Sequence, residues 1–293
     1  MEGRVNPISF LTQMIRIAIP YLFAASGGVV AERAGIVSLT LEGFMLSGAF
    51  AAVLGTNYSG SPWVGVLCGM LGGLIFSLIH AVATIRYRAD QVVVGVAINL
   101  LAIGVTRFFL KLFFASSSNS PRVAGFGGNI KAAGFDNPLL WLGIIVAPFV
   151  AFVIYKTPFG LRVRAAGEHP EAAESVGVSV TRVRYIAVAI SGILAALGGV
   201  YLALDQHQFT DQMTAGRGFI AISAVIFGRW DPVRAAAACL LFAAAETLQI
   251  QLQGSHAIPS QFIEMIPYAL TIIALAGVVG RAVPPAALGK AEA

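Results

Sequence analysis

Long apolar runs separated by short polar segments dominate the pattern of this 293-residue chain. A helix of about 20 apolar residues matches the roughly 30 Å hydrocarbon core of a bilayer, where unpaired backbone is not stable. The pattern therefore predicts an all-α polytopic membrane protein with about 8–10 transmembrane helices, in which residues 1–293 form a single domain. The runs lie at 15–33, 35–56, 63–85, 91–114, 139–155, 185–204, 217–229, 233–252 and 262–280.

Two of these runs are interrupted by glycine and polar residues. The first interruption reads AGIVSLTLEGFM over residues 34–45, and the second reads GRGFIAISAVIFGRWDP over residues 216–232. We expect broken or re-entrant helices at these places. Broken helices at corresponding positions of two halves are typical of inverted repeats around a pathway near the membrane midplane. The internal similarity is weak, so a chain without a repeat fits equally well, and the second run either crosses the bilayer or re-enters.

Composition and charge agree with a membrane protein. The chain is 57% hydrophobic and 11% charged, whereas soluble domains carry about 25% charged residues. The net charge of +5 lies mainly in loops, where Lys and Arg set topology, so it does not indicate binding to nucleic acid. Basic loops at 86–88, 156–184, 229–234 and beyond 280 alternate with loops poor in Lys and Arg. The alternation places the 157–184 loop and the C-terminus in the cytoplasm, while the side of the N-terminus depends on whether the second run crosses.

The 157–184 loop is a charged island between two apolar runs. Within it, residues 169–177 predict a short helix, because Pro170 suits the first helical position, Glu171 suits the positive N-terminus and Gly177 suits the residue after the end. Two helical turns are marginal in water, so this helix needs a partner surface or firm anchoring. The alternative is a solvated loop with a basic rim. The side chains expected to face a partner are Ala172, Val176 and Val178.

Polar side chains inside the apolar runs are costly in lipid and are candidate solute-pathway residues. Glu42, Asn99 and Glu246 lie in the second, fourth and eighth runs, and their oxygens and amide N–H groups suit solute hydroxyl or base atoms. Phe44 and Phe219 offer aromatic faces for stacking. Each also has a structural alternative. Glu42 could cap an interrupted helix, Asn99 could bridge two helices, and Glu246 could face another helix. Both phenylalanine rings could simply pack against their neighbours.

Three segments of the chain resemble one family of transporters. Residues 160–178, GLRVRAAGEHPEAAESVGV, resemble the cytoplasmic coupling loop of bacterial ABC importer permeases of the branched-chain amino acid/ribose type, with His169 where Asn or Asp is usual. Residues 32–50, ERAGIVSLTLEGFMLSGAF, and residues 218–232, GFIAISAVIFGRWDP, are similar to segments of the subgroup paired with nucleoside-binding lipoproteins. The resemblance covers nearly the whole chain.

The resemblance implies the shorter of two different permease chains, placed as a multi-pass protein in the bacterial plasma membrane. Its implied partners are an ABC ATPase, the second permease chain, an extracytoplasmic binding lipoprotein and membrane lipid. Its implied solute is a nucleoside, with a simple sugar as the alternative. The residues that would couple to the ATPase are Glu168, Pro170, Glu171, Ala172, Ala173, Val176 and Gly177.

The sequence lacks the motifs expected of an ATPase or a membrane enzyme. It contains no G-x-x-x-x-G-K-[ST] phosphate loop, so we expect ATP and Mg to bind the partner ATPase and this chain to hold no cofactor. It has no G-x-S-x-G motif and no metal-ligand spacing, so a membrane enzyme is not expected, and Cys68 and Cys239 are interpreted as small apolar residues. An ion-coupled transporter using Glu42 and Glu246 remains the alternative, although it would not need the charged island.

Overall fold

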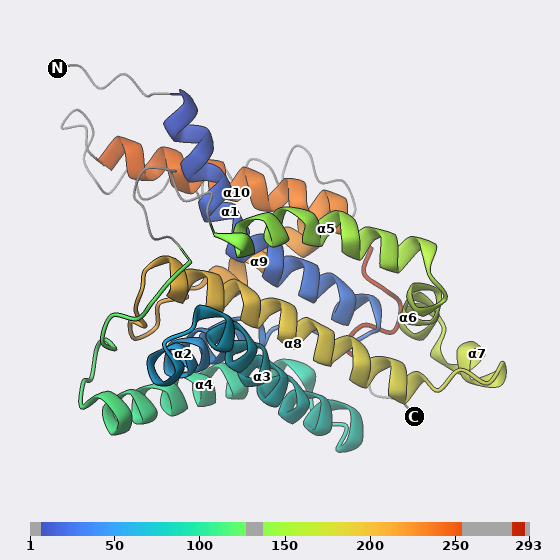
Figure 1. Ribbon diagram of the computed structural model, residues 1–293. Helices are drawn as coiled ribbons and strands as arrows, with labels where there is room; N and C mark the ends of the chain where they lie inside the picture. Colours follow the sequence, from blue (N-terminus) through green and yellow to red (C-terminus); the bar gives the residue numbers. More distant parts are fainter. Residues whose placement is uncertain (1–6, 127–136, 254–282, 291–293) are drawn as a thin grey trace.

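The computed structural model describes residues 7–126, 137–253 and 283–290, and the regular elements within these ranges are all helical. One isolated antiparallel bridge joins Asn119 to Thr210. The all-α prediction is therefore confirmed (Figure 1). The elements are α1 (Pro7–Arg33), α2 (Leu41–Ser59), α3 (Pro62–Ala81), the π-helical turn η1 (Val82–Arg86), α4 (Gln91–Phe114), α5 (Pro138–Lys156), α6 (Pro158–Glu168), α7 (Pro170–Ser175), α8 (Val180–Asp205), α9 (Arg217–Phe227) and α10 (Pro232–Gln253).

Six helices of the described part are long and apolar enough to cross a membrane, namely α1, α3 with η1, α4, α5, α8 and α10. Each coincides with a predicted run. The second run forms α2, a continuous helix of 19 residues, and the short seventh run forms α9, which has 11 residues. The ninth predicted run, 262–280, lies outside the described residues.

Both predicted interruptions are present. The first separates α1, which ends at Arg33, from α2, and its turn contains Gly35 at φ +94°. The second isolates α9, which begins after Gly216 at φ +82° and ends before Gly228. A positive φ is easy for glycine because it has no Cβ, so these residues allow the chain to leave one helical axis and enter another. The inverted repeat stays a prediction.

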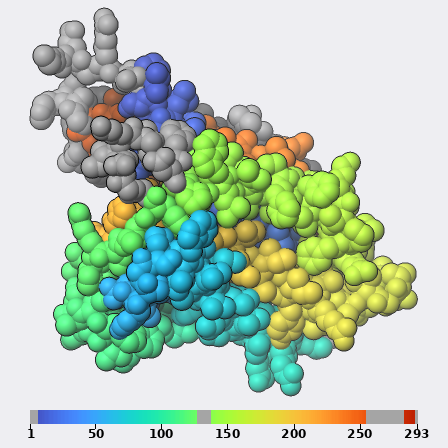
Figure 2. All heavy atoms as spheres, in the orientation of Figure 1, coloured from blue at the N-terminus to red at the C-terminus, as the bar shows by residue number. Residues whose placement is uncertain are grey.

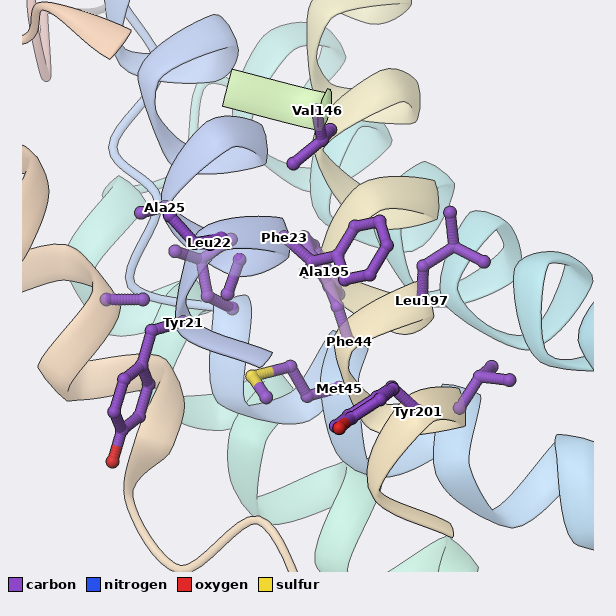
Figure 3. Packing of buried hydrophobic residues seen from close by; sticks show 14 of the residues in the cluster. Tyr21, Leu22, Phe23, Ala25, Phe44, Met45, Val146, Ala195, Leu197 and Tyr201 are labelled. Carbon is purple, nitrogen blue, oxygen red and sulfur yellow. The ribbon is translucent and has the colours of Figure 1, made fainter. Parts of the chain in front are cut away.

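Helices α1, α2 and α8 form the centre of the molecule. The most apolar windows of α1 and α8 are 78% and 72% buried, against 39% or less in the other four candidate spans. Small residues permit the close approach, because a Cβ at Gly199 of α8 would overlap the carbonyl oxygen of Met45 in α2. Figure 3 shows Phe23 of α1, Met45 of α2 and Tyr201 of α8 among the buried side chains between these helices.

Helices α3, α4 and α5 lie on the outside of the molecule, α3 and α4 beside α2 and α5 beside α1 and α10. Each exposes large apolar side chains, such as Leu71, Leu100 and Phe152, which are more than half exposed. In Figure 2, α5 is part of the visible surface. Such faces suit lipid or another membrane chain. Both cysteines are free in the structure, with Cys239 buried and Cys68 half-buried.

The charged island folds into two helices at the end of the molecule opposite the first residues of α1 (Figure 1). The predicted short helix is confirmed as α7, and Gly177 follows it at φ +85°. The preceding helix, α6, was not predicted. Its start at Pro158 follows Thr157, whose hydroxyl accepts a hydrogen bond from the N–H of Gly160 at 3.2 Å. A Thr-Pro pair is a helix-start signal, so the missed element was readable in the sequence.

Candidate functional site

A cavity of about 340 Å³ lies between α4 and the start of α9, with the beginning of α2 beside it. We call it the Glu42 cavity. It brings together three of the five residues predicted for a solute pathway, Glu42, Asn99 and Phe219. Its remaining lining is Gly43, Leu46, Val96, Leu100, Ile103, Gln212, Thr214, Ala215 and Gly216.

Glu42 lies in the first turn of α2, and its carboxylate holds the beginning of α9. One carboxylate oxygen, Oε1, accepts hydrogen bonds from the hydroxyl of Thr214 at 2.6 Å and from the N–H of Gly216 at 2.8 Å. The other, Oε2, accepts from the N–H of Gly218 at 2.6 Å. The first N–H groups of a helix lack partners within the helix and carry partial positive charge, so a carboxylate is favoured there. Glycine at 218 is required, since a Cβ would overlap the backbone N of Glu42.

Asn99 connects α4 to the interrupted segment before α2. Its Oδ1 accepts a hydrogen bond from the N–H of Gly43 at 2.9 Å, and its Nδ2 donates to the carbonyl of Leu39 at 2.8 Å. Both atoms of the amide therefore satisfy irregular backbone near the membrane interior, where water is scarce. These two bonds do not use the second hydrogen of Nδ2 or a second lone pair of Oδ1.

The two predicted aromatic residues lie in different environments. Phe219, in the first turn of α9, is 47% exposed and lines the Glu42 cavity. Phe44 is 1% exposed, and its ring packs edge-on against His80 at a centroid distance of 6.3 Å. Only Phe219 therefore presents a ring face within reach of a solute in this cavity.

Glu246 belongs to a second polar cluster on α10. It accepts a hydrogen bond from the hydroxyl of Tyr21 and forms an ion pair with Arg217 at 3.2 Å. Arg217 also lines a separate cavity of about 660 Å³, beside the Arg16–Asp205 ion pair at 3.0 Å. Since Arg217 follows Gly216 directly, α9 contacts the Glu42 cavity on one side and this second cavity on the other.

The segment before α9 has an unusual backbone. His207, Gln212 and Ala215 all have φ near +50°, the left-handed region that is rare for residues with a side chain. The segment is held from outside by the 116–126 loop, where Ser120 N donates to the carbonyl of Phe209 at 2.9 Å. Residues 116–126 thus pack against the segment that forms a wall of the Glu42 cavity, while residues 127–136 lie outside the described part.

The predicted coupling residues lie together at the end of α6, on α7 and directly after α7. Glu168 ends α6 near Arg33 at 4.0 Å, and Pro170 begins α7. Ala173 is buried beneath α7, whereas Glu171, Ala172 and Gly177 are exposed and Val176 is 77% exposed. An exposed apolar tip beside carboxylates has the character of a docking surface.

Glu32, at the end of α1, is a buried carboxylate that was not predicted from the sequence. It is 3% exposed, and it accepts hydrogen bonds from the indole N–H of Trp230 at 2.5 Å and the N–H of Ser38 at 3.2 Å. It therefore holds the turn after α9 against the turn after α1. The sequence shows a carboxylate beside the first interruption and a Trp in the second, but only the fold brings Glu32 and Trp230 together.

A family model described as branched-chain amino acid transport system / permease component matches residues 10–275. The guanosine ABC transporter permease protein NupQ of Bacillus subtilis is 42% identical, covering 93% of this chain and 92% of the relative. The nucleoside ABC transporter permease protein NupC of Lactococcus lactis is 38% identical, covering 97% of each.

Two further similarities concern assembly and fold. A second guanosine permease chain of Bacillus subtilis, NupP, is 24% identical over 90% of this chain, so that organism has two such permease proteins. A solved metal-chelate type ABC transporter in an inward-facing conformation has a TM-score of 0.51 and 13% identity, covering 94% of this chain and 91% of that one. This likeness concerns the fold alone.

Proposed function

This chain belongs to the permease components of branched-chain amino acid type transport systems, and from that premise we propose that it is a nucleoside-importing subunit of an ABC transporter in a bacterial plasma membrane. The observation that carries the proposal is the near full-length similarity to a guanosine permease at 42% identity. The exposed α7 surface, which suits contact with a soluble protein, supports it.

The partners follow from the chain's own chemistry and from its relatives. The sequence has no phosphate-binding loop, so a separate ATPase binds ATP and Mg and docks on α6 and α7. A second, different permease chain completes the pathway, as the pair of guanosine permeases in one organism suggests. An extracytoplasmic lipoprotein delivers the solute. We propose that the C-terminal segment lies in the cytoplasm, and the hydrogen bond from Ala287 N to the carbonyl of Gly167, in the loop expected on that side, supports this.

Transport requires that ATP-driven closure of the ATPase moves the helices that line the pathway. The motion reaches α7 and passes through a short turn to the central helix α8, whose first turn is buried at Val180 and Val183. A loaded binding protein on the other side favours one state through its differential affinity for that state. In the pathway, Phe219 stacks on the nucleobase, while Glu42 and Asn99 hold the backbone that forms the wall.

The proposal is tested in proteoliposomes that contain this chain, its ATPase and the second permease, with the binding protein added outside. We expect uptake of labelled guanosine, adenosine, cytidine or uridine when ATP is enclosed, and no uptake of ribose or glucose. Uptake that persists without ATP and collapses with an ionophore would identify an ion-coupled transporter instead. Sugar uptake with no nucleoside uptake would shift the substrate class to simple sugars.

The role of Phe219 has a matched control in the same assay. Phe219→Ala removes the ring that lines the cavity, and base–aromatic stacking contributes about 1–3 kcal/mol, so we expect about a tenfold fall in nucleoside uptake. Phe152→Ala on α5 removes a comparably exposed ring away from the cavity and leaves uptake unchanged. Equal effects of the two substitutions would contradict the pathway assignment.

A further inference from the structure

The segment 283–290 crosses the surface beside α7 and encloses a groove there. The groove has a volume of about 540 Å³. One side is formed by residues 168–174 of α6 and α7, and the other by Ala286, Ala287, Lys290 and Arg184. The groove is therefore formed by two elements, α7 and the facing strip of residues 283–290.

Backbone hydrogen bonds fix this strip in place. Ala287 N donates to the carbonyl of Gly167 at 2.8 Å, and Gly289 N donates to the carbonyl of Gly35 at 3.1 Å. Ala286 N donates to a carboxylate oxygen of Glu168 at 3.3 Å. Ala287 is 5% exposed, so the middle of the strip is packed against the molecule.

The chemistry of the groove indicates the charge of its occupant. Three carboxylates line it, Glu168, Glu171 and Glu174, against two basic side chains, Arg184 and Lys290, so acidic groups are in excess. Glu171 and Glu174 are exposed, and no residue of the described part forms an ion pair with either one. The apolar Val176 lies just beyond them, at 77% exposure. Carboxylates beside an exposed apolar side chain are complementary to a surface that carries Lys or Arg next to an apolar pocket.

We propose that residues 283–290 and α7 together form one docking groove for a basic segment of the ATPase subunit. The inference rests on the proposed function for the identity of the occupant, and it adds the C-terminal strip as a second contact. The strip also touches Gly35, in the turn that precedes α2 and its Glu42. An ATPase seated in the groove would therefore contact α7 and the strip, and the strip in turn is hydrogen-bonded to this turn.

Cysteine labelling of the assembled complex tests the contact without disturbing the fold. In a Cys68→Ser background, Glu174→Cys reports the helix side, Ala286→Cys the strip and Ser117→Cys the opposite end; all three positions are exposed. We expect the ATPase to slow maleimide labelling at Glu174→Cys and Ala286→Cys by about tenfold and to leave Ser117→Cys unchanged, because an interface excludes solvent at its centre.

The outcomes separate the two proposals. Protection of Glu174→Cys without protection of Ala286→Cys overturns the two-sided groove and leaves the ATP-driven function intact. A wild-type chain that does not co-purify with the ATPase, with no protection anywhere, overturns both.

The charge of the occupant is tested by the double substitution Glu171→Gln and Glu174→Gln, measured as the Kd of the ATPase at several salt concentrations. We expect the Kd at low salt to rise about tenfold and its salt dependence to flatten, because two exposed carboxylates no longer attract basic side chains. An unchanged Kd and salt dependence would rule out a basic occupant.

Discussion

Replacing Glu42 by Gln tests how the first turn of α9 is held in place. The two carboxylate oxygens accept three hydrogen bonds, at 2.6, 2.8 and 2.6 Å, and the side chain is buried. Gln keeps the size and shape of the side chain but has one oxygen and one NH2 group. If its oxygen faces Thr214 and Gly216, the NH2 group faces the N–H of Gly218, so that two donors meet.

The size of the effect follows from these contacts. Loss of a charge-assisted hydrogen bond and a buried N–H left without an acceptor cost about 1.5–3 kcal/mol. Loss of the negative charge at the N-terminus of α9 adds about 0.3–1 kcal/mol. We therefore expect the free energy of unfolding to fall by about 3 kcal/mol. Glu174→Gln, at an exposed position on α7, is the control and should change it by less than about 0.5 kcal/mol.

The measurement is reversible unfolding of the purified chain in mixed micelles, followed by circular dichroism as the denaturing detergent increases. A Glu42→Gln chain as stable as the control would mean that its carboxylate does not hold α9. A loss of uptake in such a fully stable variant would point instead to direct contact with the solute. The two roles are thus separated by comparing stability with transport.

Two further predictions concern packing and the α4 bridge. Gly199→Ala forces a Cβ onto the Met45 carbonyl and should lower the free energy of unfolding by about 1–3 kcal/mol. The control Gly104→Ala has nothing within 4 Å of the new Cβ and should be neutral or slightly stabilising. Thermal unfolding in detergent measures both. Asn99→Asp replaces the donor to the Leu39 carbonyl with a second acceptor and should lower the free energy of unfolding by about 2 kcal/mol in the same micelle titration; a change below 0.5 kcal/mol would exclude the bridge.

Local patterns in the sequence predicted most of the helices. Apolar length identified the spans, and Pro170 with Gly177 identified both ends of α7, because capping depends on neighbouring residues alone. The breaks before α2 and around α9 were readable for the same reason, since glycine and polar residues interrupt an apolar run. Helix α6 was missed because its amphipathic character was hidden within a charged segment that was interpreted as loop.

The partners of the buried polar residues were not predictable in the same way. The sequence identified Glu42 and Asn99 as unusual, but Gly218 is 176 positions from Glu42, and Leu39 is 60 positions from Asn99. Such pairs depend on how helices cross, which no local pattern encodes. Glu32 and Trp230 are 198 positions apart and were not paired for this reason.

The common feature of these buried groups is that each holds irregular backbone inside the helix bundle. Glu32 accepts a hydrogen bond from the turn before α2, and Asn99 bonds backbone groups on either side of the first residue of α2. Glu42 accepts hydrogen bonds from the start of α9. Unpaired N–H groups at these breaks would otherwise lie where water is scarce, so the side chains that most resemble solute ligands are largely occupied by the protein itself. The Glu42 cavity is left with a mainly apolar wall and the ring of Phe219. A wall of this kind favours weak contact with a passing base over tight binding, which suits a pathway that must release its solute on the other side.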